Sequence, residues 1–235
     1  MKKIALNFDY PLKYSYFIEN EDLSELKKKV DIIKKYLLSQ NFESVQIPFL
    51  TSRDTVKAVT NDYNVKNLIQ VYPAGNKKKP LLFSPYMLFL QALPLIKAGR
   101  FSYKDYPLKW FFVGPGYKGI IKSVSDPYNQ TEEIYCFQGA VFFVNDRITE
   151  IEMYLANVLE KVCELSIKNF TKDTEKLFYK KDSTVFKDRE GDFLAGYHTI
   201  QIENLRKTGI QIKNRKNKDM NLFMSSFSIS QNCLL

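Results

Sequence analysis

Apolar residues recur at helical spacing in two long segments of the chain, and these give the clearest structural predictions. In the first segment, one helical face carries Leu23, Leu26, Val30, Ile33 and Leu37. Asp22, with Glu25 three residues later, forms a capping-box pattern at the start of this segment. We therefore predict a helix over 22–40, and a similar apolar stripe predicts a second helix over 146–168.

Shorter apolar runs predict strands, because they are bounded by polar residues, glycine or proline. They lie at 44–47, 81–83, 110–113, 134–145, 197–203, 209–213 and 220–229. The run at 110–113 stops at a Gly-Pro-Gly sequence, and a polar loop over 117–131 separates it from the run at 134–145. We predict that these two runs pair as an antiparallel hairpin with the polar loop at its tip.

The remaining segments have weaker patterns. Residues 87–98 are apolar enough for a buried helix, although Pro94 must kink or restart it. We predict a loop with a short helix over 52–80 and an irregular, charged segment over 169–192. The acidic residues at 188–192 lack calcium-loop spacing, so this stretch is predicted to be a solvated turn.

The order of these elements predicts the fold class. The last strands follow one another through short turns, which is typical of an antiparallel sheet. We expect an α+β fold in which a mostly antiparallel central sheet is flanked by helices. The 235 residues contain no internal repeat and no linker rich in Gly, Pro or Ser, so one domain is expected over 1–235.

The net charge of +9 adds a class of partner to this picture. A basic surface attracts nucleic acid, anionic membranes or phosphorylated ligands. The lysines are dispersed, however, with short clusters at 27–29, 77–79 and 213–218. Clusters of this size are also common on solvated helix faces and loops, so the charge alone does not choose a partner.

The cysteines and the lengths of the apolar runs indicate in which cellular compartment the protein is expected. The three cysteines form no CxxC pair, which argues against a disulfide framework and against a structural zinc site. We find neither a signal-peptide pattern nor an apolar run of transmembrane length. We expect a cytoplasmic protein with no membrane partner.

Several segments resemble motifs of the class II aminoacyl-tRNA synthetases. Residues 26–50, a predicted helix and a strand ending at Pro48, resemble motif 1. Residues 102–118, which begin Ser-Tyr-Lys-Asp-Tyr-Pro-Leu, resemble the entry to motif 2 in the threonyl, prolyl and seryl subclass. Residues 198–203 are similar to a Thr-Ile-Gln-Leu-Asp strand of the threonyl enzymes.

This resemblance implies a class II synthetase-like fold and a homodimer with Phe42 and Pro48 at its interface. It also implies ligands, namely an amino acid, ATP with Mg²⁺, and tRNA or another RNA, with no zinc. The candidate binding residues are Lys118, Glu133, Gln138, His198, Gln201 and Glu203. For His198, a partly buried strand residue without a catalytic partner is the competing interpretation.

The chain departs from the family's pattern where catalysis depends on cations. Lys118 stands where motif 2 carries the arginine for the α-phosphate of ATP, and Ile120 replaces the glutamate that follows it. Gln231 or Asn232 stands where motif 3 has an arginine, and the threonyl zinc ligands are absent at 83–87. We therefore expect a degenerate, truncated paralogue with altered or lost aminoacyl-adenylate ligase activity, and we assign no catalytic residue.

A second hypothesis belongs to a different class of function. The chain would be a pseudoenzyme, a non-catalytic dimerisation or regulatory module that uses the same fold to bind a protein or RNA partner. Fold alone does not separate the two hypotheses, because function depends on the site rather than on the architecture.

Overall fold

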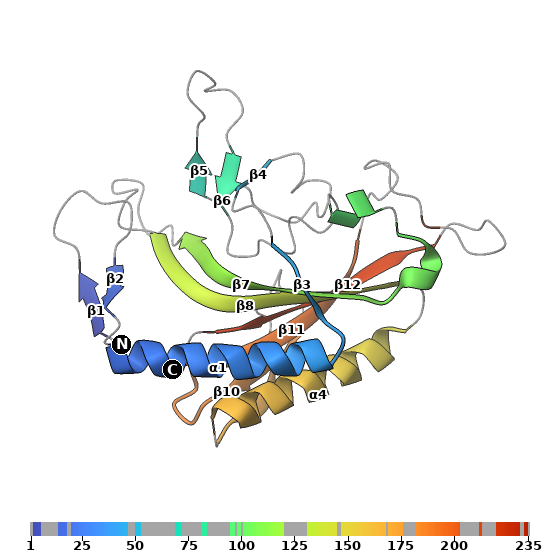
Figure 1. Cartoon of the computed structure of the whole chain (residues 1–235). Helices are drawn as coiled ribbons and strands as arrows, with labels where there is room; N and C mark the ends of the chain where they lie inside the picture. Colours follow the sequence, from blue (N-terminus) through green and yellow to red (C-terminus); the bar gives the residue numbers. More distant parts are fainter. Residues whose placement is uncertain are drawn as a thin grey trace.

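A seven-stranded sheet forms the centre of the computed structural model (Figure 1). Its strand order is β3-β7-β8-β12-β11-β10-β9, and every neighbouring pair is antiparallel except β3 and β7, which are parallel. The strands are β3 Glu43–Ser44, β7 Leu108–Gly119, β8 Thr131–Val144, β9 Thr171–Glu175, β10 Ser183–Lys187, β11 Phe193–Gln201 and β12 Leu222–Ile229. The predicted α+β class with a mostly antiparallel sheet is confirmed.

The structure describes part of the chain, and all statements below concern that part. The described residues are 2–5, 14–17, 20–46, 50–52, 69–71, 81–83, 95–96, 98–99, 101–119, 131–144, 147–167, 169–175, 182–202, 212, 220–230 and 233–234. In β7 beyond residue 114 and in β8 before residue 137, only the backbone is described.

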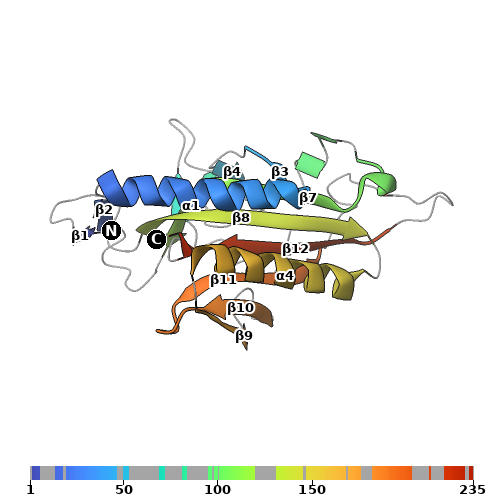
Figure 2. The same cartoon turned by 60° about the horizontal axis from the view of Figure 1, so that its bottom comes forward.

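Two long helices cover one face of this sheet, as Figures 1 and 2 show. They are α1 (Asn20–Ser39) and α4 (Ile148–Ser166), within two residues of both ends of each predicted helix. Side chains from the helices and from the sheet beneath them form the main core, which includes Ile33, Leu37, Phe42, Phe111, Phe137, Leu155, Leu159, Phe186 and Phe227. No described helix has the length and apolar character needed to cross a membrane.

The C-terminus of α1 is closed by backbone hydrogen bonds that direct the chain into the core. Asn41 has a positive φ of 60°, and its amide donates to the carbonyl of Leu38 at 3.0 Å. The amide of Phe42 donates to the carbonyl of Leu37 at 3.1 Å. This is the Schellman pattern, in which asparagine tolerates the left-handed conformation and the flanking apolar residues pack together. Phe42 is therefore held in the core immediately before β3.

Lys109 of β7 ties this helix end to α4. Its Nζ donates to the carbonyl of Gln40 at 3.2 Å and to the hydroxyl of Tyr154 at 3.1 Å. It also lies 4.2 Å from the centre of the Tyr154 ring, at cation–π distance. Burial lowers the pKa of Lys109. The ammonium meets the negative end of the α1 dipole, which helps to keep it charged there.

The predicted hairpin is present, but its strands are longer than expected. Trp110 pairs with Ala140, and pairing continues as far as Gly119 with Thr131. The prediction that Gly-Pro-Gly at 114–116 ends the strand was wrong, as was the boundary of the tip at residues 117 and 131. Parallel pairing of β3 with β7 reaches only Trp110 and Phe111, so the described part of β7 beyond them has one β-partner. Proline is tolerated in such an edge segment because its missing N–H leaves no ladder bond unmade on the open side.

Residues 169–192 are also more regular than predicted. They contain β9 and β10, which pair from Ser183 with Glu175 to Lys187 with Thr171. The side chains of β9 are mostly exposed and polar, as expected of an edge strand protected against further pairing. Because its side chains are polar, β9 has no hydrophobic pattern from which the sequence could predict a strand. The predicted turn is confirmed at 188–192, where a carboxylate oxygen of Asp188 accepts from the amides of Glu190 and Asp192.

Two smaller sheets complete the described structure. The first pairs β1 (Lys2–Ala5) with β2 (Tyr14–Phe17). The second has the order β4-β6-β5, with β4 Leu50–Ser52, β5 Ile69–Val71 and β6 Leu81–Phe83. The predicted strand at 81–83 is confirmed, whereas β5 lies where a loop with a short helix was expected. Of the predicted helix over 87–98 and the predicted strand over 209–213, only 95–96, 98 and 212 lie within the described residues.

Candidate ligand-binding face of the sheet

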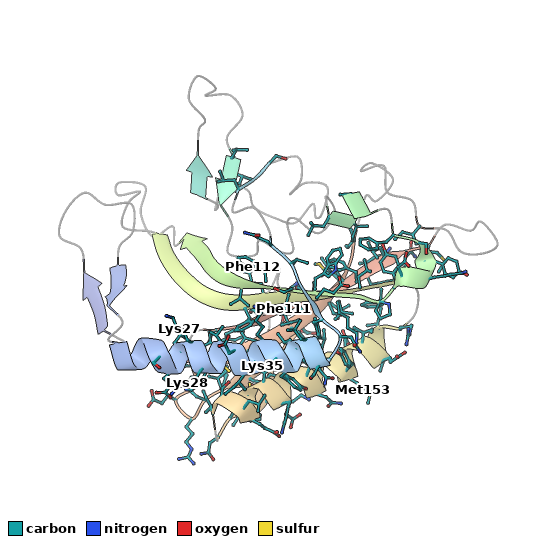
Figure 3. The ribbon with its side chains drawn as sticks, viewed as in Figure 1. Lys27, Lys28, Lys35, Phe111, Phe112 and Met153 are labelled. Carbon is teal, nitrogen blue, oxygen red and sulfur yellow. The ribbon has the colours of Figure 1, made fainter. Side chains whose placement is uncertain are left out.

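The face of the sheet opposite α1 and α4 carries a polar group of side chains among apolar ones. One cross-strand row runs from Trp110 through Ala140 and Ser226 to His198. The neighbouring row runs from Phe112 through Gln138 and Ser228 to Gly196. Figure 3 shows Phe111 and Phe112 on opposite sides of β7, which separates this face from the helix-covered one. We call Gln138, His198, Ser226 and Ser228 the polar patch.

His198 lies within the polar patch and is almost completely buried, with 4% of its surface exposed. Its Nδ1 lies 3.2 Å from the hydroxyl oxygen of Ser226. Burial lowers the pKa of His198 to about 4. At neutral pH the ring is therefore uncharged, and it can exchange a hydrogen bond but cannot supply a cation.

Gln138 is the second buried polar residue of the patch, with 5% of its surface exposed. An amide side chain offers both donors and an acceptor, so it suits a ligand with mixed polar groups. Gly196 and Ser228 share its row and have small side chains. At the β11 end of the row, the ring of Phe193 lies over Gly196, where an added Cβ would come within 2.9 Å of it.

At the β7 side of the polar patch lie aromatic side chains whose positions are fixed by packing and by a hydrogen bond. Trp110 packs against Phe142 with ring centres 5.2 Å apart, and its indole N–H donates to a carboxylate oxygen of Glu43 at 3.2 Å. The short helix η2 (Tyr103–Asp105) precedes these aromatic residues and is fixed by a capping box with Ser102. Tyr106 follows it and packs against the same apolar cluster as Trp110.

Tyr106 brings an unsatisfied polar atom to this side of the sheet. Among the described side chains, its hydroxyl is buried and makes no hydrogen bond. Burial, and to a lesser extent the charge of Asp105, raises the pKa of Tyr106, so the phenol stays protonated. A buried hydroxyl without a partner costs about 1–3 kcal/mol, and a ligand that bonds it would recover that cost.

The structure brings together two of the predicted site residues and separates the others. Gln138 and His198 lie on one face, two strands apart, with β12 between β8 and β11. The backbone of Lys118 pairs with that of Glu132, six residues along β7 from the Phe112–Gln138 pair. That is about 20 Å at the usual rise of a strand. Glu133 pairs with Tyr117 in the same distal part of the hairpin.

The remaining candidates lie elsewhere. Gln201 is exposed at the end of β11 and alternates with His198, so it belongs to the opposite side of the sheet. Glu203 and Pro48 lie outside the described residues. Phe42, predicted at a dimer interface, is 2% exposed within a single chain and packs edge-on against Phe227.

Sequence reasoning did not single out Ser226, Ser228, Trp110 or Tyr106 as members of one site. A signal was present in β12, where serines interrupt an otherwise apolar strand at 225, 226 and 228. Only the strand register shows that two of them face His198 and Gln138. No group of His, Cys, Asp or Glu suited to a metal ion is found among the described residues.

Comparisons with known proteins place this geometry in a fold family. No protein-family model and no curated protein matches the sequence. Prolyl-tRNA synthetase from Cryptosporidium parvum, solved with L-proline and AMP, aligns with a TM-score of 0.74 at 12% identity, over 97% of this chain and 49% of that one. The same enzyme with halofuginone and AMPPNP gives 0.76 at 12% identity, over 97% and 48%.

A second enzyme gives the same result. Prolyl-tRNA synthetase from Giardia lamblia, in complex with prolyl-adenylate, aligns with a TM-score of 0.76 at 13% identity, over 97% of this chain and 47% of that one. The chain thus spans about half the length of these structural neighbours. At this level of identity the likeness concerns the fold, and this chain has the class II aminoacyl-tRNA synthetase-like α+β fold.

Proposed function

We propose that this chain is a cytoplasmic class II synthetase-like protein that binds an amino acid, a nucleotide or an aminoacyl-adenylate, with altered or lost ligase activity. The observation that carries the proposal is the polar patch, because buried Gln138 and His198 bring groups that can donate and accept hydrogen bonds to one otherwise apolar sheet face. The unsatisfied hydroxyl of Tyr106 on the same side supports it. The structural neighbours were solved with proline, AMP, AMPPNP or prolyl-adenylate.

The charge of this face supports binding more strongly than catalysis. Adenylate formation needs preorganised cations at the phosphates, and the loss of one such donor typically costs about 10²–10³ in rate. Lys109 is the one cationic residue among the described side chains of β7, β8, β11 and β12, and it lies on the helix-covered face. His198 is neutral at pH 7 because its pKa is lowered.

Lys118 remains the candidate for a phosphate contact in this proposal. As a compact charge it would hold a phosphate of ATP–Mg²⁺ without the bidentate grip of an arginine. Glu133 would lie in the same end of the hairpin, and Gln201 and Glu203 would contribute only if a ligand reached the strand end. No zinc is expected.

Calorimetric titration tests the ligand proposal. The titrants are ATP–Mg²⁺, single amino acids, and a non-hydrolysable aminoacyl-adenylate analogue. Gln138→Leu, which keeps the side-chain size, should weaken binding about five- to thirtyfold, since one buried hydrogen bond is worth roughly 1–2 kcal/mol. Gln46→Leu, at an exposed glutamine outside the polar patch, is the matched control and should change binding less than about twofold. Equal effects of both substitutions, in variants with native melting temperatures, would place the ligand elsewhere.

Amino-acid-dependent ATP–pyrophosphate exchange tests the ligase part of the proposal. Because Lys118 and Gln231 or Asn232 stand at the two motif positions that carry arginine, exchange should be at least roughly a thousandfold below that of a prolyl-tRNA synthetase measured in parallel. Exchange at a comparable rate with any one amino acid would contradict altered activity and favour an ordinary ligase.

The second candidate is a non-catalytic dimerisation or regulatory module that binds a protein or RNA. The absence of cationic side chains from the described strands around the polar patch favours it. It predicts no binding of any titrant together with stable capture of a partner.

A further inference from the structure

The solvent-facing side of α1 carries a group of lysines that outnumbers the acidic residues among them. Lys27, Lys28, Lys34 and Lys35 are all exposed, and Figure 3 shows three of them along the helix. We call these four residues the α1 lysines. The exposed acid among them is Asp31.

Nearby carboxylates do not pair with the α1 lysines. In the described part of the chain, the ion pair of this helix is Lys29 with Glu25, at 3.5 Å. On α4, Arg147 and Lys161 have their own partners in Glu150 and Glu164. The α1 lysines make neither an ion pair nor a hydrogen bond in that part. Four ammonium groups therefore share a single acidic neighbour on this side of the helix, Asp31, which lies three or four residues from each of them.

Their spacing suits an extended polyanion. The two adjacent pairs are seven residues apart, so they lie about 10 Å from each other along the helix axis. A nucleic-acid strand carries one phosphate per about 3.4 Å of duplex length, so several phosphates fall within the reach of both pairs. A small anion would engage one pair only.

The apolar residues on this side argue against the other partners of a basic helix. Ile32 and Leu38 are 45% and 46% exposed, but they are six positions apart in the sequence, which places them about 120° apart around the helix. They therefore form no continuous stripe of the kind that inserts into a membrane surface. A second copy meeting this side through a twofold axis would bring like charges together, which disfavours association.

From these observations we infer that the α1 lysines form a binding surface for the phosphodiester backbone of a nucleic acid. The surface lies on the helix layer, across the sheet from the polar patch, as the arrangement in Figure 1 shows. A nucleic acid held there does not contact the face of the sheet that carries the polar patch. This inference is independent of the ligand proposed for that patch.

Fluorescence anisotropy with labelled oligonucleotides tests it. The probes are mixed-sequence 20-nucleotide RNA and DNA, single-stranded and duplex, between 50 and 200 mM salt. Four phosphate contacts predict that the logarithm of the association constant falls with the logarithm of salt with a slope of about −3.6 for duplex or −2.8 for single strands. Comparison of the probes shows which nucleic acid fits.

The decisive variant replaces the α1 lysines by glutamine, as Lys27→Gln, Lys28→Gln, Lys34→Gln and Lys35→Gln together. Glutamine keeps helix propensity, so the fold should be retained. The matched control changes four exposed cations elsewhere, as Lys104→Gln, Lys161→Gln, Lys172→Gln and Arg189→Gln, with the same change in net charge. The α1 variant should lose nearly the whole salt slope and at least about tenfold in affinity, while the control should keep most of both.

Equal losses in the two variants would overturn the inference, because they would show attraction by net charge alone. Stronger binding to anionic phosphatidylglycerol vesicles than to any oligonucleotide would overturn it in favour of a membrane. Titration of the polar-patch ligand into the α1 variant should give the wild-type affinity. A failure of the patch proposal is thereby distinguished from a failure of this one.

Discussion

At the scale of single residues, His198 shows how burial sets the protonation state of a side chain. It is the one histidine of the chain, and the β-sheet holds it 4% exposed beside Ser226. An unfolded histidine has a pKa near 6.5, whereas burial lowers the pKa of His198 to about 4. Between these two values, the unfolded chain binds a proton that the folded chain does not. The contribution of His198 to the free energy of unfolding is therefore fully present above the unfolded-state pKa, and it is lost as the pH falls toward the folded-state pKa.

This gives a measurable dependence on pH. From pH 7 to pH 5, the protonation of unfolded His198 should lower the free energy of unfolding by about 2 kcal/mol. Urea denaturation of the protein and of His198→Gln at both pH values isolates this contribution, because carboxylates titrate equally in both. NMR titration of the single histidine gives its pKa directly, and a folded-state pKa near 6.5 would contradict the prediction.

At the scale of elements, the contact between β8 and β12 depends on a missing side chain. Gly139 pairs with Phe227, and a Cβ added at Gly139 would lie 2.0 Å from the Cζ of that ring. Phe227 is in turn buried against Phe42. Because Gly139 has no side chain, the ring of Phe227 can occupy the space beside it. This contact lies in the core next to Phe42, the residue immediately before β3.

Gly139→Ala should destabilise the protein by about 1–3 kcal/mol, the usual cost of forcing extra volume into a packed core. Chemical denaturation measures it. Combining the substitution with Phe227→Leu should cost less than the sum of the single changes, because the smaller side chain makes room. Simple additivity would show that the ring moves aside without strain.

At the scale of the whole molecule, the open question is assembly. The predicted twofold dimer would use α1 and the strand before Pro48, but the side chain of Phe42 already fills the core of its own chain. What α1 offers outward is the α1 lysines. A dimer formed along that side would have to overcome their repulsion.

Sedimentation at several salt concentrations tests the dimer. If it forms through α1, raising the salt from 50 to 200 mM should tighten it, because screening weakens the like-charge repulsion. Replacing the α1 lysines by glutamine should tighten it further. A monomer at micromolar concentration under all conditions would remove the predicted interface and leave the surface free for nucleic acid.

The sequence by itself determined the helices, the order of the elements and the fold class. Helices α1 and α4 carry apolar stripes at a period set by local backbone geometry, and the antiparallel pairing of β7 with β8 follows from two apolar runs around a polar loop. A polar edge strand such as β9 carries no such pattern, since its hydrogen bonds depend on a neighbour rather than on burial of its side chains.

Only the tertiary structure decided the site. His198, Gln138 and Ser226 come from β11, β8 and β12, and they meet because strand register places them on one face. The pairing of β7 with β8 also leaves the backbone of Lys118 far along the hairpin from Gln138. A shift of one residue in any strand would exchange the two faces. Long-range register is a property of the packed sheet, and the order of residues along the chain does not state it.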